Sequence, residues 1–215
     1  PTSVTVVGGM ATTFNTEEFM LENPSIDFVI RGEGELVFFN FIKNLVTYDF
    51  DFGDVAGLAY REGGDIKVNP LEASIRFEDI PFPYEKLEVN RGDIVGYESM
   101  RGAIDRCAYA QFLPDAQLRS LPLNRICSEL KYFIVRGASE VHFVDKWFNY
   151  NPQKAYRIWE YIINNDNGEI SFFFDIDGDV LDEEQINLLK GARKGLFVFN
   201  VDIESTNPEA LDSVG

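Results

Sequence analysis

The chain has 215 residues, of which 45% are hydrophobic and 14% aromatic, so it can bury a core large enough for a folded domain. Its formal net charge of −17 argues against nucleic-acid binding by phosphate neutralisation and against docking on anionic membranes. The sequence has two cysteines, no long apolar run and no opening typical of a signal peptide, which favours a reducing, cytoplasmic location.

The first fifty residues predict an alternation of strands and helices. The first strand is apolar and ends at Gly8-Gly9. Asn15, followed three residues later by Glu18, indicates the start of a helix. The predicted elements are strands at 3–7 and 26–30 and helices at 15–22 and 35–46.

Residues 51–92 are predicted to form a linker that contains a β-hairpin. Two apolar arms around Gly63-Gly64 indicate the hairpin at 55–69. The run 77–87 is interrupted by prolines and shows neither helical nor strand periodicity.

Strict alternation of strands and helices resumes after residue 92. The strands are apolar for most of their length on both faces, which is typical of a parallel sheet covered by helices. The chain opens inside a strand and stops in a helix that has barely begun, so we expect a fragment of a longer protein. The predicted elements are strands at 93–98, 139–145, 170–176 and 196–203 and helices at 122–136, 152–165 and 182–192.

Acidic residues follow three of the predicted strands. Asp145, Asp177 and Glu204 each lie at or just past a carboxyl end, and in β/α barrels that rim builds the active site. Carboxylates there could accept hydrogen bonds from an ammonium group or from ribose hydroxyls. The alternative is that they are solvated acids without a ligand.

Other candidate residues have simpler structural explanations. Gly8-Gly9 lets a ligand approach the backbone closely, but a tight turn explains such a pair equally well. Cys127 has helical spacing to apolar neighbours and is expected in the core. His142 is the single histidine, so a histidine-based metal site or triad has little support. The acidic run 175–184 has its glycine at the wrong position for a calcium loop.

Taken together, these segments resemble the radical SAM proteins that carry a cobalamin-binding domain, over essentially the whole chain. The matching segments are VVGGMATTFNTEEFM (6–20) and IDFVIRGEGELVFFNFI (26–42). The resemblance implies an α/β protein. Residues 1–50 would be the C-terminal half of a Rossmann-like cobalamin-binding domain, with Gly8 and Gly9 at the cobalamin. Residues 51–92 would be the linker, and 93–215 the first four β/α units of a partial (β/α)6 radical SAM barrel.

The most specific match lies in the loop after the first barrel strand. The family pattern is Arg-Gly-Cys, three residues, Cys, one residue, an aromatic and Cys. The Arg-Gly pair, the middle cysteine and the aromatic are present as Arg101, Gly102, Cys107 and Tyr109. Alanines stand at the two outer cysteine positions, as Ala103 and Ala110.

The resemblance also implies a set of ligands. The family uses a [4Fe-4S] cluster, S-adenosylmethionine and cobalamin, together with a reductant such as flavodoxin or ferredoxin. Asp202 stands where relatives usually have glycine, close to the ligand. The residues implied to contact S-adenosylmethionine are Tyr109, Asp145, Asp177, Glu204 and Ser205.

The implied reaction is radical methyl transfer or rearrangement on a small molecule that the sequence does not identify. Thiolates retain such clusters, so Cys107 alone should not hold one, and we predict that the chain is inactive as given. One interpretation is a radical SAM enzyme whose cysteines have been replaced. The other is a naturally degenerate, non-catalytic relative that binds a ligand or partner. An unrelated α/β binding module would require all these matches to be coincidences.

Overall fold

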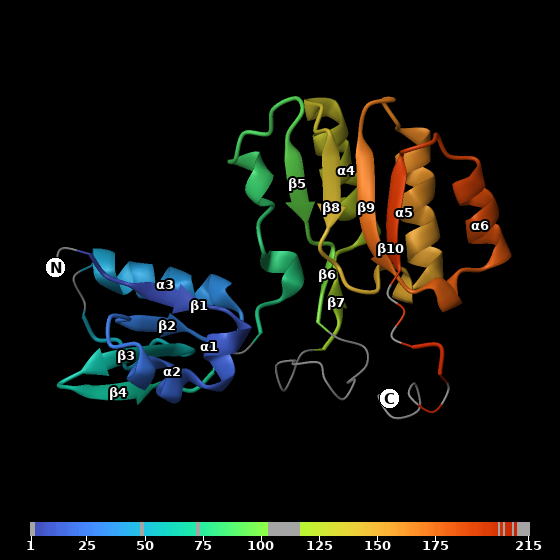
Figure 1. The fold of residues 1–215 in the computed structure, drawn as a ribbon. Helices are drawn as coiled ribbons and strands as arrows, with labels where there is room; N and C mark the ends of the chain where they lie inside the picture. Colours follow the sequence, from blue (N-terminus) through green and yellow to red (C-terminus); the bar gives the residue numbers. More distant parts are fainter. Residues whose placement is uncertain are drawn as a thin grey trace. The chain divides into compact units, whose positions relative to one another are not determined.

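The computed structural model describes residues 3–47, 50–71, 74–102, 117–201, 203, 205–207 and 209. The chain divides into two compact units, Pro1–Ile80 and Pro81–Gly215. Figure 1 shows a mixed α/β fold in each of them, with a sheet and its covering helices.

The first unit is built on a four-stranded sheet in the order β1-β2-β3-β4 (Figure 1). β1 runs parallel to β2, whereas β3 pairs antiparallel with both β2 and β4. The strands are β1 (Val6–Gly8), β2 (Phe28–Ile30), β3 (Leu58–Glu62) and β4 (Asp65–Val68). The helices are α1 (Met10–Phe14), α2 (Thr16–Glu22) and α3 (Gly34–Val46).

Helices cover both faces of this first sheet. Alternate residues of β3 belong to different apolar clusters, because successive side chains of a strand point to opposite faces. Leu58 packs in a cluster with Val37 and Phe41 of α3. Ala59 packs in another cluster with Met20 of α2. The first unit is therefore a three-layer α/β sandwich.

The predicted hairpin belongs to this sheet, so its assignment to a linker was wrong. β3 pairs with β2 from Phe28↔Tyr60 to Ile30↔Leu58. Arg61 extends the attachment, since its guanidinium donates to the carbonyls of Ile26 and Met20. The first compact unit accordingly continues to residue 80, instead of ending at residue 50.

The second unit contains a four-stranded parallel sheet in the order β10-β9-β8-β5, as predicted. Its strands are β5 (Ile94–Tyr97), β8 (Glu140–Phe143), β9 (Ser171–Ile176) and β10 (Phe197–Val201). Its helices are α4 (Leu123–Arg136), α5 (Pro152–Asn164) and α6 (Glu183–Lys190). Short 3-10 turns are η1 (Phe77–Asp79), in the first unit, and η2 (Pro83–Glu85), η3 (Phe148–Tyr150) and η4 (Gly178–Val180).

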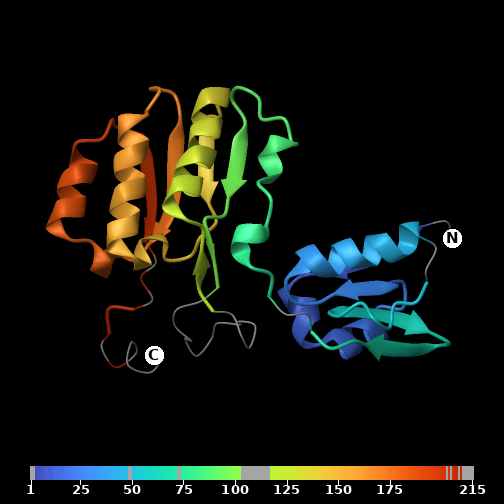
Figure 2. The ribbon, with the colours of Figure 1, turned by 180° about the vertical axis from the view of Figure 1, so that it is seen from behind.

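The helices of this unit lie on one face of its sheet, as Figure 2 shows. Burial alternates along the strands: Phe172 and Phe174 are buried, whereas Ile94 and Val198 on the other face are 65% and 42% exposed. The predicted parallel sheet covered by helices is confirmed, and among the described residues the helices cover one of its faces. Apolar residues at every position of a strand do not show which face of the sheet the helices cover.

Helix starts differ in how their free N–H groups are satisfied. Asn15 precedes α2, but its side chain makes no capping hydrogen bond, so the predicted reason for that start was wrong. Asp182 and Gln185 form a complete capping box at α6. Asn151 caps α5 by accepting from the Lys154 amide at 3.1 Å. These two caps fix the helix ends that lie next to the carboxyl ends of the strands.

Candidate functional site

The carboxyl ends of the four parallel strands lie at one edge of the second sheet. Asp145 comes two residues after β8, Asp177 directly follows β9, and Ser205 follows β10. The sheet register therefore brings these three predicted residues to the same edge. The other predicted site residues of the second unit lie outside the described residues: Ala103, Cys107, Tyr109, Ala110 and Glu204, together with Asp202.

Asp145 is 2% exposed and is bonded to the protein's own backbone. Its Oδ1 accepts from the amides of Ser99 at 2.8 Å and Met100 at 3.1 Å, and its Oδ2 pairs with the Ser99 hydroxyl. Burial raises the pKa of Asp145 to about 7, although the hydrogen bonds from Ser99 and Met100 oppose that rise. The expected contact with the methionine part of S-adenosylmethionine stays a prediction.

Two very short strands form a stem just past β5 (Figure 1). β6 (Met100–Arg101) pairs antiparallel with β7 (Arg119–Ser120), with Met100 opposite Ser120. We call these four residues the β6–β7 stem. The chain leaves the stem at Gly102 and returns to it at Gln117, and the segment between them, which contains Cys107, lies outside the described residues.

Gly102 is required by the geometry of this stem. Its φ is +109°, a region that residues with side chains rarely adopt. A Cβ at this position would lie 2.3 Å from the carbonyl oxygen of Gln117. The glycine of the Arg-Gly pair is thus explained by a close backbone approach, with no ligand needed to account for it.

Lys154 reaches the same stem from the first turn of α5. Its Nζ donates to Ser120 Oγ and to the Leu121 carbonyl, each at 2.5 Å. Burial lowers the pKa of Lys154, and the nearby Asp145 opposes that change. Nothing in the sequence around Lys154 indicates this contact.

Asp177 is held at the end of β9 by Asn149, a second residue that the sequence did not reveal. Asn149 is fully buried, donates to the Asp177 carbonyl at 2.7 Å and accepts from the Asp177 amide at 2.9 Å. The Asp177 carboxylate accepts from the amide of Asp179 at 2.9 Å. Ser205 Oγ likewise accepts from the amide of Asn207. Both side chains thus have local backbone partners.

In the first unit, Gly8 and Gly9 lie at the carboxyl end of β1. Gly9 has a φ of +118°, and an added Cβ there would meet nothing within 4 Å. Its carbonyl accepts from the hydroxyls of Thr12 and Thr13. The surface beside Gly9 is therefore open to a ligand. Arg31 has a structural role, since it donates to Thr16 Oγ1 and to the Asn69 carbonyl.

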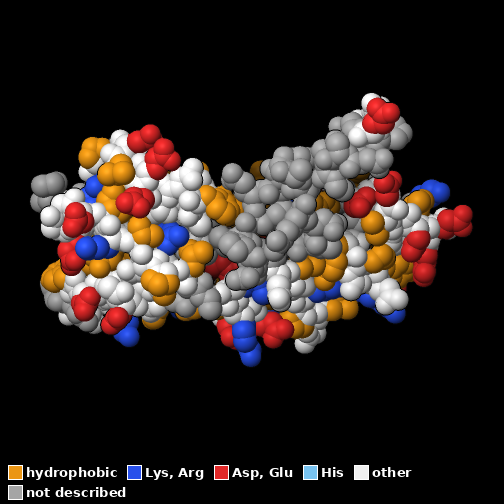
Figure 3. All heavy atoms as spheres, turned by 90° about the horizontal axis from the view of Figure 1, so that it is seen from below, with side chains coloured by type: hydrophobic (Ala, Val, Ile, Leu, Met, Phe, Trp, Pro, Cys, Tyr) orange, Lys and Arg blue, Asp and Glu red, His pale blue; other side chains and the backbone are white. Residues whose placement is uncertain are grey.

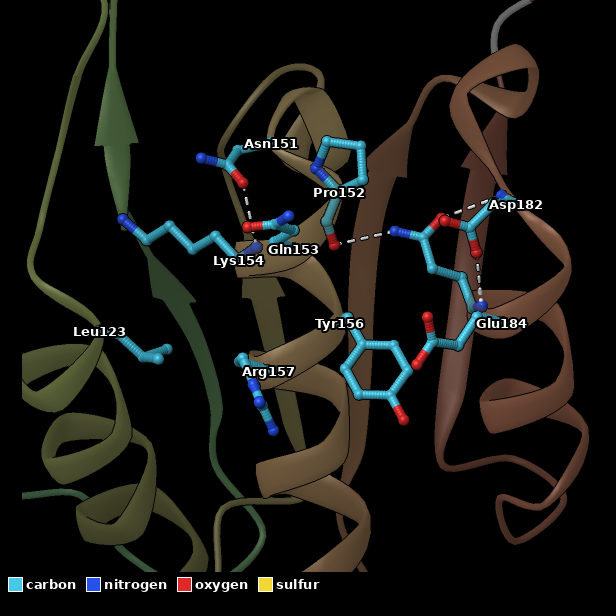
Figure 4. A pocket seen from close by; sticks show the side chains of 10 residues that line it. Leu123, Asn151, Pro152, Gln153, Lys154, Tyr156, Arg157, Asp182 and Glu184 are labelled. Atoms are coloured by element: carbon cyan, nitrogen blue, oxygen red, sulfur yellow. Dashed lines mark hydrogen bonds between the residues drawn. The ribbon is translucent and has the colours of Figure 1, made fainter.

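Figure 4 shows a pocket of about 630 Å³ at the first turns of the helices in the second unit. The Lys154 side chain extends away from Tyr156 and Arg157 in this view. Gln185 joins α6 to α5 by donating to the Pro152 carbonyl at 2.9 Å. The lining residues include both cations and carboxylates, and none of the residues predicted to contact S-adenosylmethionine.

Among the described residues, no three His, Cys, Asp or Glu side chains are arranged to hold a metal ion. The same part of the chain has no helix long and apolar enough to cross a membrane. Figure 3 views the molecule from the carboxyl edge of the second sheet, and the described Lys and Arg side chains on this face lie scattered among acidic ones.

No protein-family model matches the chain. An uncharacterized methyltransferase of Pyrococcus horikoshii is 28% identical over 222 residues, which cover 98% of this chain and 47% of that protein. The cobalamin-dependent radical SAM methyltransferase TokK of Streptomyces tokunonensis is 23% identical over 167 residues, which cover 71% of this chain and 24% of that protein. The chain thus spans less than half the length of either relative.

A solved structure shares the fold. The radical S-adenosylmethionine methyltransferase TsrM from Kitasatospora setae, with tryptophan and a SAM analogue bound, matches with a TM-score of 0.67 and 20% identity. The match covers 97% of this chain and 43% of TsrM. TsrM has also been solved with cobalamin and a [4Fe-4S] cluster bound. The sequence relatives, the shared fold and the Arg-Gly pattern agree in one respect: the chain is similar to the radical SAM proteins that carry a cobalamin-binding domain.

Proposed function

We propose that the chain is the part of a radical SAM methyltransferase or rearrangement enzyme that spans the cobalamin-binding and S-adenosylmethionine-binding regions. The observation that carries this proposal is the β6–β7 stem, which holds Arg101, and Gly102 beside it, at the carboxyl edge of a parallel sheet. Ligands of β/α folds bind at that edge, where loops from several strands meet. The cytoplasm is the expected location and a small molecule the expected substrate.

The [4Fe-4S] cluster does not fit the side chains of this chain. Alanine has no donor atom, so the loop offers one thiolate, Cys107, where the family uses three. Among the described residues, no other group of possible ligands compensates for the missing thiolates. We therefore propose that the chain as given binds ligands but does not perform reductive cleavage. A flavodoxin or ferredoxin would be needed as electron donor only by a form of the protein that holds the cluster.

For S-adenosylmethionine we propose a site at the carboxyl edge formed by Asp177, Ser205, Tyr109 and Glu204, with Asp145 beneath it. The two described edge residues already have local partners, so they offer their remaining lone pairs to a ligand. For cobalamin we propose the surface at Gly8 and Gly9 in the first unit, because a Cβ added at Gly9 would meet nothing within 4 Å.

Calorimetric titration of S-adenosylmethionine tests the proposed function. Without iron to chelate its amino and carboxylate groups, the ligand keeps hydrogen bonds of roughly 1 kcal/mol each and an aromatic contact. We therefore expect a dissociation constant between about micromolar and millimolar. Glu204→Ala is expected to weaken binding by about tenfold.

The control is Glu62→Ala, which removes an exposed glutamate from β3 in the other unit. This variant should bind like the unchanged chain. Equal heats for all three proteins, or nanomolar binding by any of them, would place the ligand elsewhere and refute the proposed site.

A further inference from the structure

The β6–β7 stem is too small to be stable by itself. It has two residues in each strand and two paired positions, whereas even longer isolated hairpins are only marginally stable in water. In the cluster-binding relatives the cluster would tie the intervening loop together, but here two of its three ligands are alanine. The stem therefore needs another source of stability.

One strand of the stem is held by Asp145. This carboxyl group lies just past β8 and binds the amides of Ser99 and Met100, where the chain enters β6. It also pairs with the Ser99 hydroxyl, so both of its oxygens are used. A carboxyl group that is 2% exposed, with three partners from one segment, fixes the position of that segment.

The other strand is held by Lys154. Its ammonium group donates to Ser120 Oγ and to the Leu121 carbonyl, where the chain leaves β7. The two sides meet at one atom: the Ser99 carbonyl accepts from the Leu121 amide at 2.9 Å and from the Ser120 hydroxyl at 3.3 Å. Asp145 and Lys154 come from one β/α unit, from the loop after β8 and from the first turn of α5, so this unit holds both sides of the stem.

We propose that Asp145 and Lys154 are positioning residues that hold the β6–β7 stem closed without a metal cluster, each binding one of its strands. The inference rests on the proposed function only in identifying the segment beyond the stem as the cluster loop. It predicts that the loop anchors are preformed in this chain, and that restoring the missing thiolates needs no rearrangement of the sheet.

Backbone hydrogen exchange, followed by mass spectrometry, tests the proposal on the chain as given. Asp145→Asn replaces one acceptor oxygen by an amide that donates, so exchange over residues 98–102 should become at least about tenfold faster. Lys154→Met removes both donors to the other strand and should accelerate exchange over 117–121 similarly. Peptides from β8 and β9 should stay unchanged.

Matched controls use the same substitutions at exposed neighbours, as Asp179→Asn and Lys146→Met. Neither should alter exchange in the stem. Unchanged hydrogen exchange of the β6–β7 stem in both Asp145→Asn and Lys154→Met would overturn the proposal. Equal acceleration in every peptide of the second unit would also overturn it, because that result means general destabilisation.

A second readout separates positioning from mere folding. In a chain carrying Ala103→Cys and Ala110→Cys, adding Asp145→Asn or Lys154→Met should lower the affinity for iron about tenfold. The far-ultraviolet circular dichroism spectrum should stay unchanged. Equal iron affinity with and without the Asp145→Asn or Lys154→Met substitution would overturn the positioning role. If the chain with both cysteines itself retains no iron, the proposed function fails. The hydrogen-exchange measurement alone then decides whether Asp145 and Lys154 hold the β6–β7 stem.

Discussion

Restoring two cysteines, with Ala103→Cys and Ala110→Cys together, is expected to raise retained iron from below one to about four atoms per chain after anaerobic reconstitution. The unchanged chain offers one thiolate in the loop, Cys107, and alanine offers no donor. The flanking pattern is intact, since Arg101, Gly102 and Tyr109 occupy their family positions. The measurement is iron content together with the visible thiolate-to-iron absorbance of the desalted protein.

Two further variants control this experiment. Adding Cys107→Ala to the restored chain should abolish iron retention, because it removes the middle ligand. Adding Cys127→Ala should leave it unchanged, since Cys127 lies on α4, away from the loop in sequence. Retention of about four irons by the unrestored chain would reveal another ligand set and contradict the argument from missing thiolates.

Gly102→Ala is expected to destabilise the second unit by at least about 3 kcal/mol. The added Cβ would lie 2.3 Å from the Gln117 carbonyl oxygen, and only a shift of backbone atoms can relieve this clash. The residue would also be forced into a φ of +109°. Because both tryptophans, Trp147 and Trp159, lie in the second unit, tryptophan fluorescence during urea unfolding follows that unit specifically.

Gly92→Ala separates the two causes. Gly92 has a φ of +90° in the same unit, but an added Cβ would meet nothing within 4 Å. This control should therefore show only the backbone strain, about 1–2 kcal/mol. If both variants lose the same stability, the close approach between Gly102 and Gln117 contributes nothing, and the geometric explanation of the Arg-Gly pair is wrong.

The long elements of the second unit could be predicted closely from sequence. The helix expected at 152–165 is α5, Pro152–Asn164, and the strand expected at 170–176 is β9, Ser171–Ile176. Proline fits the first turn of a helix, and short apolar runs between amphipathic helices fit a parallel sheet. The order of these elements along the chain also carried the family resemblance.

The parts that the sequence did not predict depend on contacts between distant residues. β6 and β7 have two residues each, too few to show any period. The hairpin at β3 and β4 was identified, but its pairing with β2 is a tertiary choice that the strand pattern does not encode. Likewise, the side of the sheet that helices cover becomes visible only from burial.

The candidate site shows the same limit. Residues at strand ends could be placed at one edge because parallel strands share that edge, and Asp145 and Asp177 do lie there. Their partners could not be predicted: Lys154 resembles any surface lysine of an amphipathic helix, and Asn149 resembles a loop residue. Such supporting residues are identified by the hydrogen bonds they make across the fold.

The most direct test of the account compares the affinity for S-adenosylmethionine of two proteins, the unrestored chain and the reconstituted chain with Ala103→Cys and Ala110→Cys. The family resemblance implies that an open iron of the cluster binds two polar groups of this ligand. The account predicts at least about 100-fold tighter binding by the restored, cluster-loaded chain in calorimetric titration. Equal affinities would contradict the proposal that Ala103 and Ala110 are what keeps this chain from holding a cluster that binds S-adenosylmethionine.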